Sequence, residues 1–245
     1  MPDVLNAPVY TASSSNTSAE ASVVSQIFAD PSLGSLRTNV AAGTVLYEPD
    51  DSATGIHYIY RGQVRLYQVA PDGSQRLVEI LGPGEWFGVA ALARSSQYWT
   101  RAVAVVPSVL GEVQADRLLA WLATRPQYLL ELNRQLAEKV QAAHEDAACL
   151  IFEDCNQRLI KTLLRFSASA AATRVDDNVV LRITHNQLAQ AVGVARETVS
   201  LALTQLRHQN VLRTGRNQLI FNPEALRRFT RRQDAQPVLA MQEVA

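Results

Sequence analysis

Hydrophobic and polar residues alternate in short runs through the first half of the chain. The clearest runs are TVLY, IHYIYRG, QVRLYQVA, QRLVEIL, RAVAVVP and SVLGEV, which all lie between residues 34 and 113. Alternation with a period of two is typical of half-buried strands. Nine of the eleven glycines fall in the same region, and PDGS at 71–74 is a hairpin turn between two runs. This pattern predicts a β-roll or jelly roll.

A helical period replaces the alternation after Gly111. Residues 112–172 contain no glycine and one proline, Pro126, which suits the first turn of a helix. Apolar residues then recur every three or four positions over about three heptads, at Leu129, Leu132, Leu136, Val140, Ala143, Ala147 and Leu150. The seam predicts a long helix over 126–152 that pairs with a second copy of the chain. The alternative is a helix that packs only on its own domain.

Two further helices are predicted near the C-terminus. ITHNQLAQAVGV begins a helix at Thr184, where Gln187 is the capping-box partner, and Gly193 ends it. A second helix is predicted from about Arg196 to Gln209. The stretch AAATRVDDN, which precedes both helices, is expected to be a loop.

A hairpin is predicted to follow these helices. VLRTGRNQLIF supplies two short strands with a turn at 215–217, and Asn222 with Pro223 then begins a last short helix. Two helices joined by a tight glycine turn and followed by a hairpin form a winged helix-turn-helix.

The patterns predict an α+β chain with an N-terminal β-roll, a long dimerisation helix and a C-terminal winged helix-turn-helix. The expected segments are a disordered arm at 1–22, the β-roll sensor at 23–125, the dimerisation helix at 126–152, the DNA-binding domain at 153–232 and a tail at 233–245.

The formal net charge of zero conceals an asymmetry. Residues 1–155 carry ten Lys/Arg and seventeen Asp/Glu, whereas residues 156–232 carry thirteen Lys/Arg and four Asp/Glu. The first segment is therefore −7 and the second +9. This distribution indicates a polyanionic partner for the C-terminal part alone.

Composition argues against several classes of protein. No apolar run reaches the ~18 residues of a membrane span, no secretory signal is recognisable, and the only cysteines are Cys149 and Cys155. We therefore expect a cytoplasmic protein without membrane contact. Catalytic motifs such as a Walker loop, G-x-S-x-G or H-E-x-x-H are absent, and dispersed histidines argue against a metal site or an enzyme. A non-specific DNA-coating protein remains an alternative.

The helix at 196–209 carries the side chains expected to read DNA. Arg196, Glu197, Ser200 and Thr204 lie on one side, and arginine can pair with guanine while a carboxylate accepts from cytosine. The expected phosphate contacts of the wing come from Arg213 and Arg216. The other expected DNA contacts are Thr184, His185 and Leu201.

The chain from about residue 34 to 230 resembles the CRP/FNR family of bacterial transcription regulators. The segments that carry the resemblance are ITHNQLAQAVGVARETVSLALTQLRHQNVL, GPGEWFGVAAL and RAVAVVPSVLGEV. The resemblance implies a homodimer joined along the long helix, a pseudo-palindromic double-stranded DNA site and RNA polymerase as a further partner. Family members usually carry an arginine where this chain has Leu201, so the half-site should differ at one position.

The effector pocket departs from the family pattern as well. The ribose-binding glutamate of cyclic-AMP binders is replaced by Val89 after Gly88, and their Arg-Ser pair corresponds to Tyr98 and Trp99. Cyclic AMP is therefore disfavoured. The residues expected to line a pocket are Gly88, Val89, Ala90, Arg101, Ala143 and His144.

Three possibilities remain for that pocket. A small metabolite such as 2-oxoglutarate or a nucleotide could gate the protein, as FGVAAL resembles the nitrogen-control branch. An unidentified ligand could bind instead. Alternatively, no cofactor or effector is needed because the aromatic residues Trp86, Phe87, Tyr98 and Trp99 fill the space.

Overall fold

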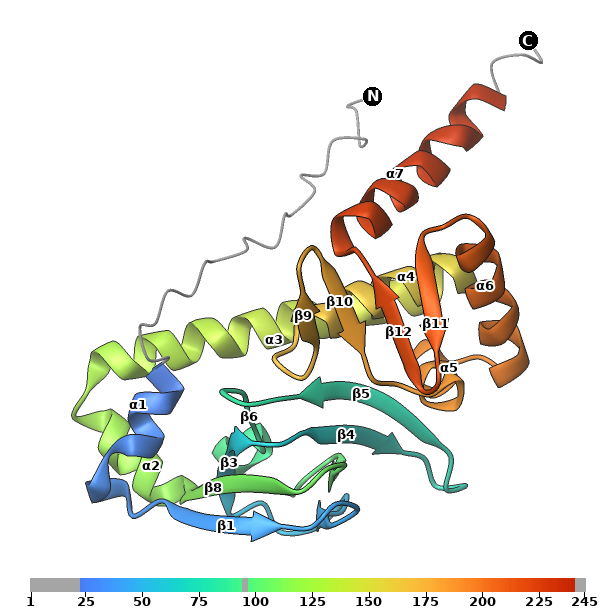
Figure 1. Ribbon diagram of the computed structural model, residues 1–245. Coiled ribbons are helices and arrows are strands. Elements are labelled where there is room, and N and C mark those ends of the chain that lie inside the picture. Colours follow the sequence, from blue (N-terminus) through green and yellow to red (C-terminus); the bar gives the residue numbers. More distant parts are fainter. Residues whose placement is uncertain (1–22, 94–96, 241–245) are drawn as a thin grey trace, which may run out of the picture.

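The computed structural model describes residues 23–93 and 97–240, except for the side chains of 232–240 (Figure 1). The arm predicted at 1–22 lies outside the described residues. Two short helices, α1 (Val23–Ala29) and η1 (Pro31–Leu33), precede the first strand. Val24, Ile27 and Phe28 of α1 are buried against the β-roll, so the ordered N-terminal segment is part of that domain.

The N-terminal domain is a roll of two antiparallel four-stranded sheets. One sheet has the order β1-β8-β3-β6 and the other has the order β2-β7-β4-β5. The strands are β1 (Leu36–Val40), β2 (Val45–Tyr47), β3 (Gly55–Arg61), β4 (Val64–Val69), β5 (Gln75–Leu81), β6 (Trp86–Phe87), β7 (Arg101–Ala104) and β8 (Ser108–Gln114). The short helix η2 (Val89–Leu92) follows β6. The β-roll predicted from alternation is therefore confirmed.

The β4–β5 hairpin forms at the predicted PDGS turn. Ser74 accepts a main-chain hydrogen bond from Ala70, and Gly73 adopts a φ of 81°, a conformation that costs glycine little. Alternate residues of β4 then face opposite sides of the sheet. Leu66 joins the core inside the roll, whereas Tyr67 joins a second core outside it.

A long helix leads from the roll to the C-terminal domain (Figure 1). The short helix α2 (Ala115–Ala123) precedes α3 (Pro126–Phe152), which has the predicted bounds and the predicted proline in its first turn. On the roll side of α3, Gln135 accepts a hydrogen bond from Nε1 of Trp86 at 2.9 Å, and Lys139 forms an ion pair with Glu79. The first half of α3 is thus fixed to the sensor.

The C-terminal domain has the predicted winged helix-turn-helix order. Its helices are α4 (Cys155–Ala168), α5 (His185–Val192), α6 (Arg196–His208) and α7 (Pro223–Ala240), and its strands are β9 (Thr173–Val175), β10 (Asn178–Leu181), β11 (Leu212–Gly215) and β12 (Gln218–Phe221). The strands form one antiparallel sheet in the order β11-β12-β10-β9.

Two predictions for this domain were wrong. The expected loop AAATRVDDN contains strand β9, because Asp176 adopts a φ of 53° and turns the chain into a hairpin with β10. Aspartate tolerates this left-handed conformation better than most residues. The last helix is also not short, since α7 continues through residues assigned to a tail from 233.

The two domains share one hydrophobic core. Tyr67, Leu77 and Ile80 of the outer face of β4 and β5 are buried together with apolar residues of α4, α5 and α6. Arg65 of the same face donates from Nη2 to the main-chain carbonyl of Arg182 at 2.8 Å. The sensor sheet is therefore packed on both faces, with the roll interior on one side and the DNA-binding domain on the other.

Candidate nucleic-acid interface

The turn between α5 and α6 is fixed by capping and by one glycine. Thr184 caps α5, where its hydroxyl accepts from the amide of Gln187 and the Gln187 side chain bonds back, as predicted. Gly193 ends α5 with a φ of 76°, which lets the chain turn sharply into α6. Val199, Leu203 and Leu206 bury one face of α6. The opposite face is consequently held outward.

The outward face of α6 carries the predicted DNA-reading residues. Arg196 and Glu197 are exposed in its first turn, and Leu201 is 68% exposed one turn later. No described ion pair engages Arg196 or Glu197, so both side chains are available to a ligand. An exposed leucine in this position has no packing role in the chain itself.

Ser200 and Thr204 are oriented by local hydrogen bonds. The Ser200 hydroxyl donates to the carbonyl of Arg196 at 3.0 Å, and that of Thr204 donates to the carbonyl of Ser200 at 2.9 Å. His185 of α5 lies with Nδ1 2.9 Å from Oγ of Ser200. These local contacts orient both side chains in the absence of a ligand.

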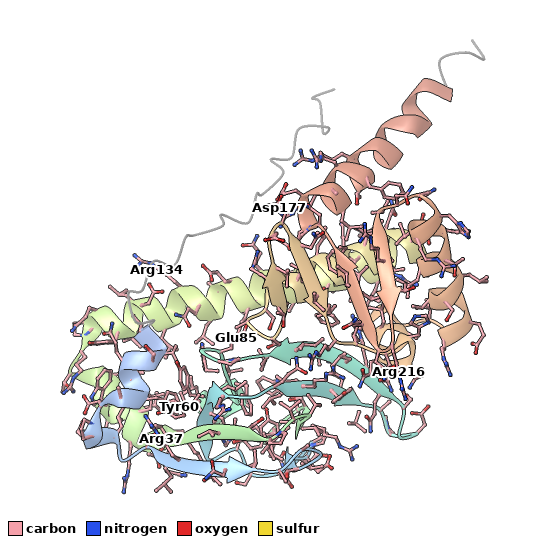
Figure 2. The ribbon with its side chains drawn as sticks, in the orientation of Figure 1. Arg37, Tyr60, Glu85, Arg134, Asp177 and Arg216 are labelled. Atoms are coloured by element: carbon pink, nitrogen blue, oxygen red, sulfur yellow. The ribbon has the colours of Figure 1, made fainter. Side chains whose placement is uncertain are left out.

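The wing presents two arginines at the predicted hairpin. Arg213 on β11 is exposed, and Arg216 lies in the turn beside Asn217, whose φ is 55°. Figure 2 shows Arg216 at the end of the wing that points toward the sensor strands. On α7, Arg227 forms an ion pair with Glu224, which reduces its contribution to the basic surface.

An open groove of about 600 Å³ lies between the β4–β5 turn of the sensor and the helix-turn-helix, beside the shared core. Its sensor wall is the β4–β5 turn, at 68–70 and 74–76, and its other wall includes Asn186, Gln190 and residues 193–196. Arg196 is therefore one of the residues that line this groove. Sequence reasoning missed it because its walls are about 120 residues apart in the chain.

The predicted effector residues are not gathered in one pocket. Gly88 begins η2 with a φ of 86°, next to Val89 and buried Ala90. Arg101 instead forms an ion pair with Glu48 at 2.7 Å. It lies on the face of β7 opposite Ala102, which belongs to the core of the roll. On α3, Ala143 and His144 are exposed.

Aromatic side chains occupy the roll beside Gly88. Tyr98 is 5% exposed and stacks on Tyr47, with ring centroids 3.7 Å apart, while its hydroxyl donates to the carbonyl of Gly55 at 2.8 Å. His57 stacks on Phe87, and burial lowers its pKa to about 4. A Cβ atom on Gly88 would lie 3.1 Å from the His57 ring, so the packing here is tight.

The aromatic set differs from the predicted one at a single member. Trp86, Phe87 and Tyr98 are buried as expected, with Nε1 of Trp86 bonded to Gln135 of α3, but Trp99 is 59% exposed. No motif in the sequence pointed to Tyr47 and His57, because they come from strands that precede the glycine-rich segment. Their stacking depends on the pairing of sheets rather than on any local motif.

The predicted dimer residues divide into two groups. Leu132 is 3% exposed and belongs to the sensor core, which removes it from the seam, and Leu136 is partly buried against that core. The remaining members are exposed along α3, namely Leu129, Val140, Ala143, Ala147 and Leu150. The neighbouring Ile151 and Phe152 are 73% and 81% exposed. Most of this apolar stripe on α3 is thus exposed in the described chain, while Leu150 also lies beside Ala191 and Val192 of α5.

Two family models match the chain. A cyclic nucleotide-binding domain matches residues 37–125, and a Crp-like helix-turn-helix domain matches residues 157–229. A β-roll joined by a long helix to a winged helix-turn-helix defines a two-domain DNA-binding transcription regulator.

Curated relatives specify the family. The CRP-like cAMP-activated global transcriptional regulator of Mycobacterium tuberculosis is 30% identical over 194 residues, which are 77% of this chain and 85% of the relative. The cAMP-activated global transcriptional regulator CRP of Pasteurella multocida is 27% identical over 172 residues, which are 69% of this chain and 81% of the relative. The chain belongs to the CRP/FNR family of transcription regulators.

Solved structures share the fold. FixK2 from Bradyrhizobium japonicum superposes with a TM-score of 0.70 at 22% identity and covers 79% of this chain and 96% of its own. The c-di-GMP-responsive global regulator CLP of Xanthomonas campestris gives a TM-score of 0.67 at 22% identity, covering 82% and 99%. Among the described residues, no helix has the length and apolar character of a membrane span.

Proposed function

We propose that the chain is a homodimeric, sequence-specific DNA-binding regulator whose α6 helices read the two halves of a pseudo-palindromic site. The observation that carries this proposal is the division of α6 into a buried apolar face and an exposed face with Arg196 and Glu197 in its first turn. The N-terminal residues of a recognition helix are those that reach base edges. RNA polymerase in the cytoplasm is the further partner that a regulator of this family needs.

The homodimer is supported by the apolar stripe of α3. Leu129 and Val140 are 40% and 55% exposed, and two such stripes packed together would remove them from water. A two-fold dimer also places two α6 helices in successive major grooves, about 34 Å apart. The symmetry of the protein then requires a site with the same symmetry.

Control by cyclic AMP is disfavoured by the chemistry around Gly88. A cyclic phosphate needs an arginine or a set of free amide groups. Next to Gly88 stands Val89, the ring of Tyr98 packs close by, and Arg101 is paired with Glu48. We infer that the roll acts as a closed platform, meaning that it supports the DNA-binding domain without binding an effector. A metabolite such as 2-oxoglutarate or a nucleotide is the alternative occupant.

Binding-site selection followed by titration of two variants tests the DNA-reading assignment. We expect Glu197→Gln to cost about 1–3 kcal/mol on the selected site and to relax the preference at one base pair. The matched phosphate-contact variant, Arg216→Gln, should weaken selected and random DNA alike and flatten the salt dependence. Equal losses on both DNAs for Glu197→Gln would contradict the assignment.

Calorimetric titration tests the closed platform. We expect no heat of binding when cyclic AMP or 2-oxoglutarate is added to the purified dimer, and no change in affinity for the selected site. An effector must bind one state of the dimer better than the other. A tenfold change in DNA affinity with either metabolite would establish the alternative.

A further inference from the structure

Four basic side chains meet where the sensor joins the DNA-binding domain. Arg76 comes from β5 of the sensor, whereas Arg158, Lys161 and Arg165 come from successive turns of α4. They line a cavity of about 20 Å³, together with Asp146 of α3 and residues of α5. A cavity of this size holds a single small occupant rather than a nucleotide.

Acidic residues neutralise only half of this cluster. Lys161 pairs with Glu153 and Arg165 pairs with Asp146. Within the part of the chain that the structure describes, neither Arg76 nor Arg158 has an acidic partner. The cavity wall therefore retains an excess of two positive charges.

The arginine donors at this junction are buried and unused. Nε of Arg76, of Arg158 and of Arg165 is inaccessible and has no hydrogen-bond partner. Burial lowers the pKa of Arg165 to about 10, and burial together with the charge of Arg158 lowers that of Arg76. Buried donors of this kind are costly when unpaired, and like charges add to that cost.

We propose that this cavity is an anion site that binds a small tetrahedral oxyanion of the phosphate type, held chiefly by Arg76 and Arg158. A guanidinium presents its N–H groups as a fork that matches two oxygens of such an anion. The anion would neutralise the excess charge and accept hydrogen bonds from the two guanidinium groups. An ordered water could accept a hydrogen bond but could not neutralise the charge.

The two ligating arginines come from different domains, so binding at this site affects how the domains are arranged. Because Arg76 belongs to the sensor and Arg158 to the DNA-binding domain, the complete site exists only while the two domains are docked. A ligand that binds only that arrangement stabilises it by mass action. The bound anion would therefore hold the DNA-binding domain against the sensor sheet.

Thermal unfolding of the full chain in inorganic phosphate, against potassium chloride of equal ionic strength, tests the proposal. At phosphate tenfold above its Kd, we expect the Tm of the wild-type protein to rise by about 3–6 °C. The variant Arg158→Gln should lose this rise and should be at least as stable as wild type in chloride, since it removes a like charge. The exposed control Arg174→Gln should keep the full rise.

A second variant and a direct titration complete the test. Arg158→Lys keeps the charge but not the fork, and we expect its Kd for phosphate to be about tenfold weaker by calorimetry. The proposal is overturned if phosphate gives no rise beyond chloride, or if Arg158→Gln and Arg174→Gln respond equally. It is overturned as well if Arg158→Gln lowers the Tm equally in both salts, because Arg158 would then be purely structural.

Discussion

Ser169, directly after α4, donates a hydrogen bond from Oγ to Oε2 of Glu85 at 2.8 Å. The same carboxylate accepts from the amide of Gly82, and a Cβ atom on Gly82 would lie 2.3 Å from the main chain of Ala171. The turn before β6 (with Glu85 labelled in Figure 2) therefore packs directly on the segment that leads into the wing sheet. This contact joins the sensor to the DNA-binding domain through a partly desolvated charge.

Removal of the serine hydroxyl should weaken this junction. Ser169→Ala takes a donor from a carboxylate and also frees the amide of Ala171, which bonds to Oγ. We expect a loss of about 1.5–3 kcal/mol in the free energy of unfolding, as measured by urea titration at pH 7.5. Ser169→Thr retains a hydroxyl and serves as the control.

The loss of unfolding free energy caused by Ser169→Ala should depend on pH. Burial raises the pKa of Glu85 above its ordinary value, and the Ser169 hydrogen bond opposes that rise because it favours the ionised form. Ser169→Ala should therefore cost most where Glu85 is ionised and progressively less as acid protonates it. A loss of the same size at pH 7.5 and pH 5 would contradict this account of the contact.

His57 should give the protein a measurable dependence of stability on pH. Burial lowers its folded-state pKa to about 4, below the value near 6.5 of an unfolded chain. Between these values the unfolded chain binds a proton that the folded chain does not. The contribution of His57 to the free energy of unfolding should therefore be fully present above about pH 6.5 and be lost as the pH falls toward 4. The slope from this group should approach ~1.4 kcal/mol per pH unit.

Two histidine-to-asparagine variants separate the contribution of His57 from that of carboxylates that titrate in the same pH range. The free energy of unfolding is measured across pH 4–7 for wild type, His57→Asn and His208→Asn, the last being an exposed histidine. We expect the difference between wild type and His57→Asn to shrink as the pH falls. His208→Asn should parallel wild type, and parallel curves for all three proteins would rule out the buried-histidine effect.

Leu201 should determine one base of each half-site. Its exposure means that Leu201→Arg leaves the fold intact while it adds a side chain able to hold guanine bidentately. We expect binding-site selection with this variant to gain a G·C preference at one position per half-site. His208→Arg adds the same charge at the far end of α6 and should raise affinity without changing base preference. An unchanged selected sequence for Leu201→Arg would remove Leu201 from the DNA contacts.

The α3 stripe predicts a charge-sensitive dimer. Val140→Glu would place a carboxylate beside its own symmetry copy, so we expect the dimer dissociation constant to weaken by at least tenfold in sedimentation equilibrium. Gln141→Glu adds the same charge on the adjacent face of the helix and should leave association nearly unchanged. Monomers for both variants, or dimers for both, would show that α3 does not form the interface.

Much of the architecture could be predicted because its signals are local. The bounds of α3 follow from Pro126 and from the apolar repeat, and the start of α5 follows from the Thr184–Gln187 pair. The hairpin of β9 with β10 was missed, because it depends on a single aspartate in a left-handed conformation and on pairing with β12.

The candidate functional residues also divide into those that local patterns predict and those that depend on tertiary packing. A helix period is enough to place Arg196 and Glu197 on the exposed face of α6. It cannot show whether Arg101 points into the roll, since that depends on which face of β7 meets the core. It also cannot show that Arg76 and Arg158 converge, because the docking of two domains brings them together.

The three sensor residues Tyr67, Leu77 and Ile80 belong to the core of the DNA-binding domain, and this limits how the chain can be recombined. A fragment that began at α4 would lack part of its own interior and would expose an apolar wall to self-association. A chimera that joins this DNA-binding domain to another sensor must therefore keep β4 and β5 of the original sensor. Target preference and sensor are therefore not interchangeable modules in this protein.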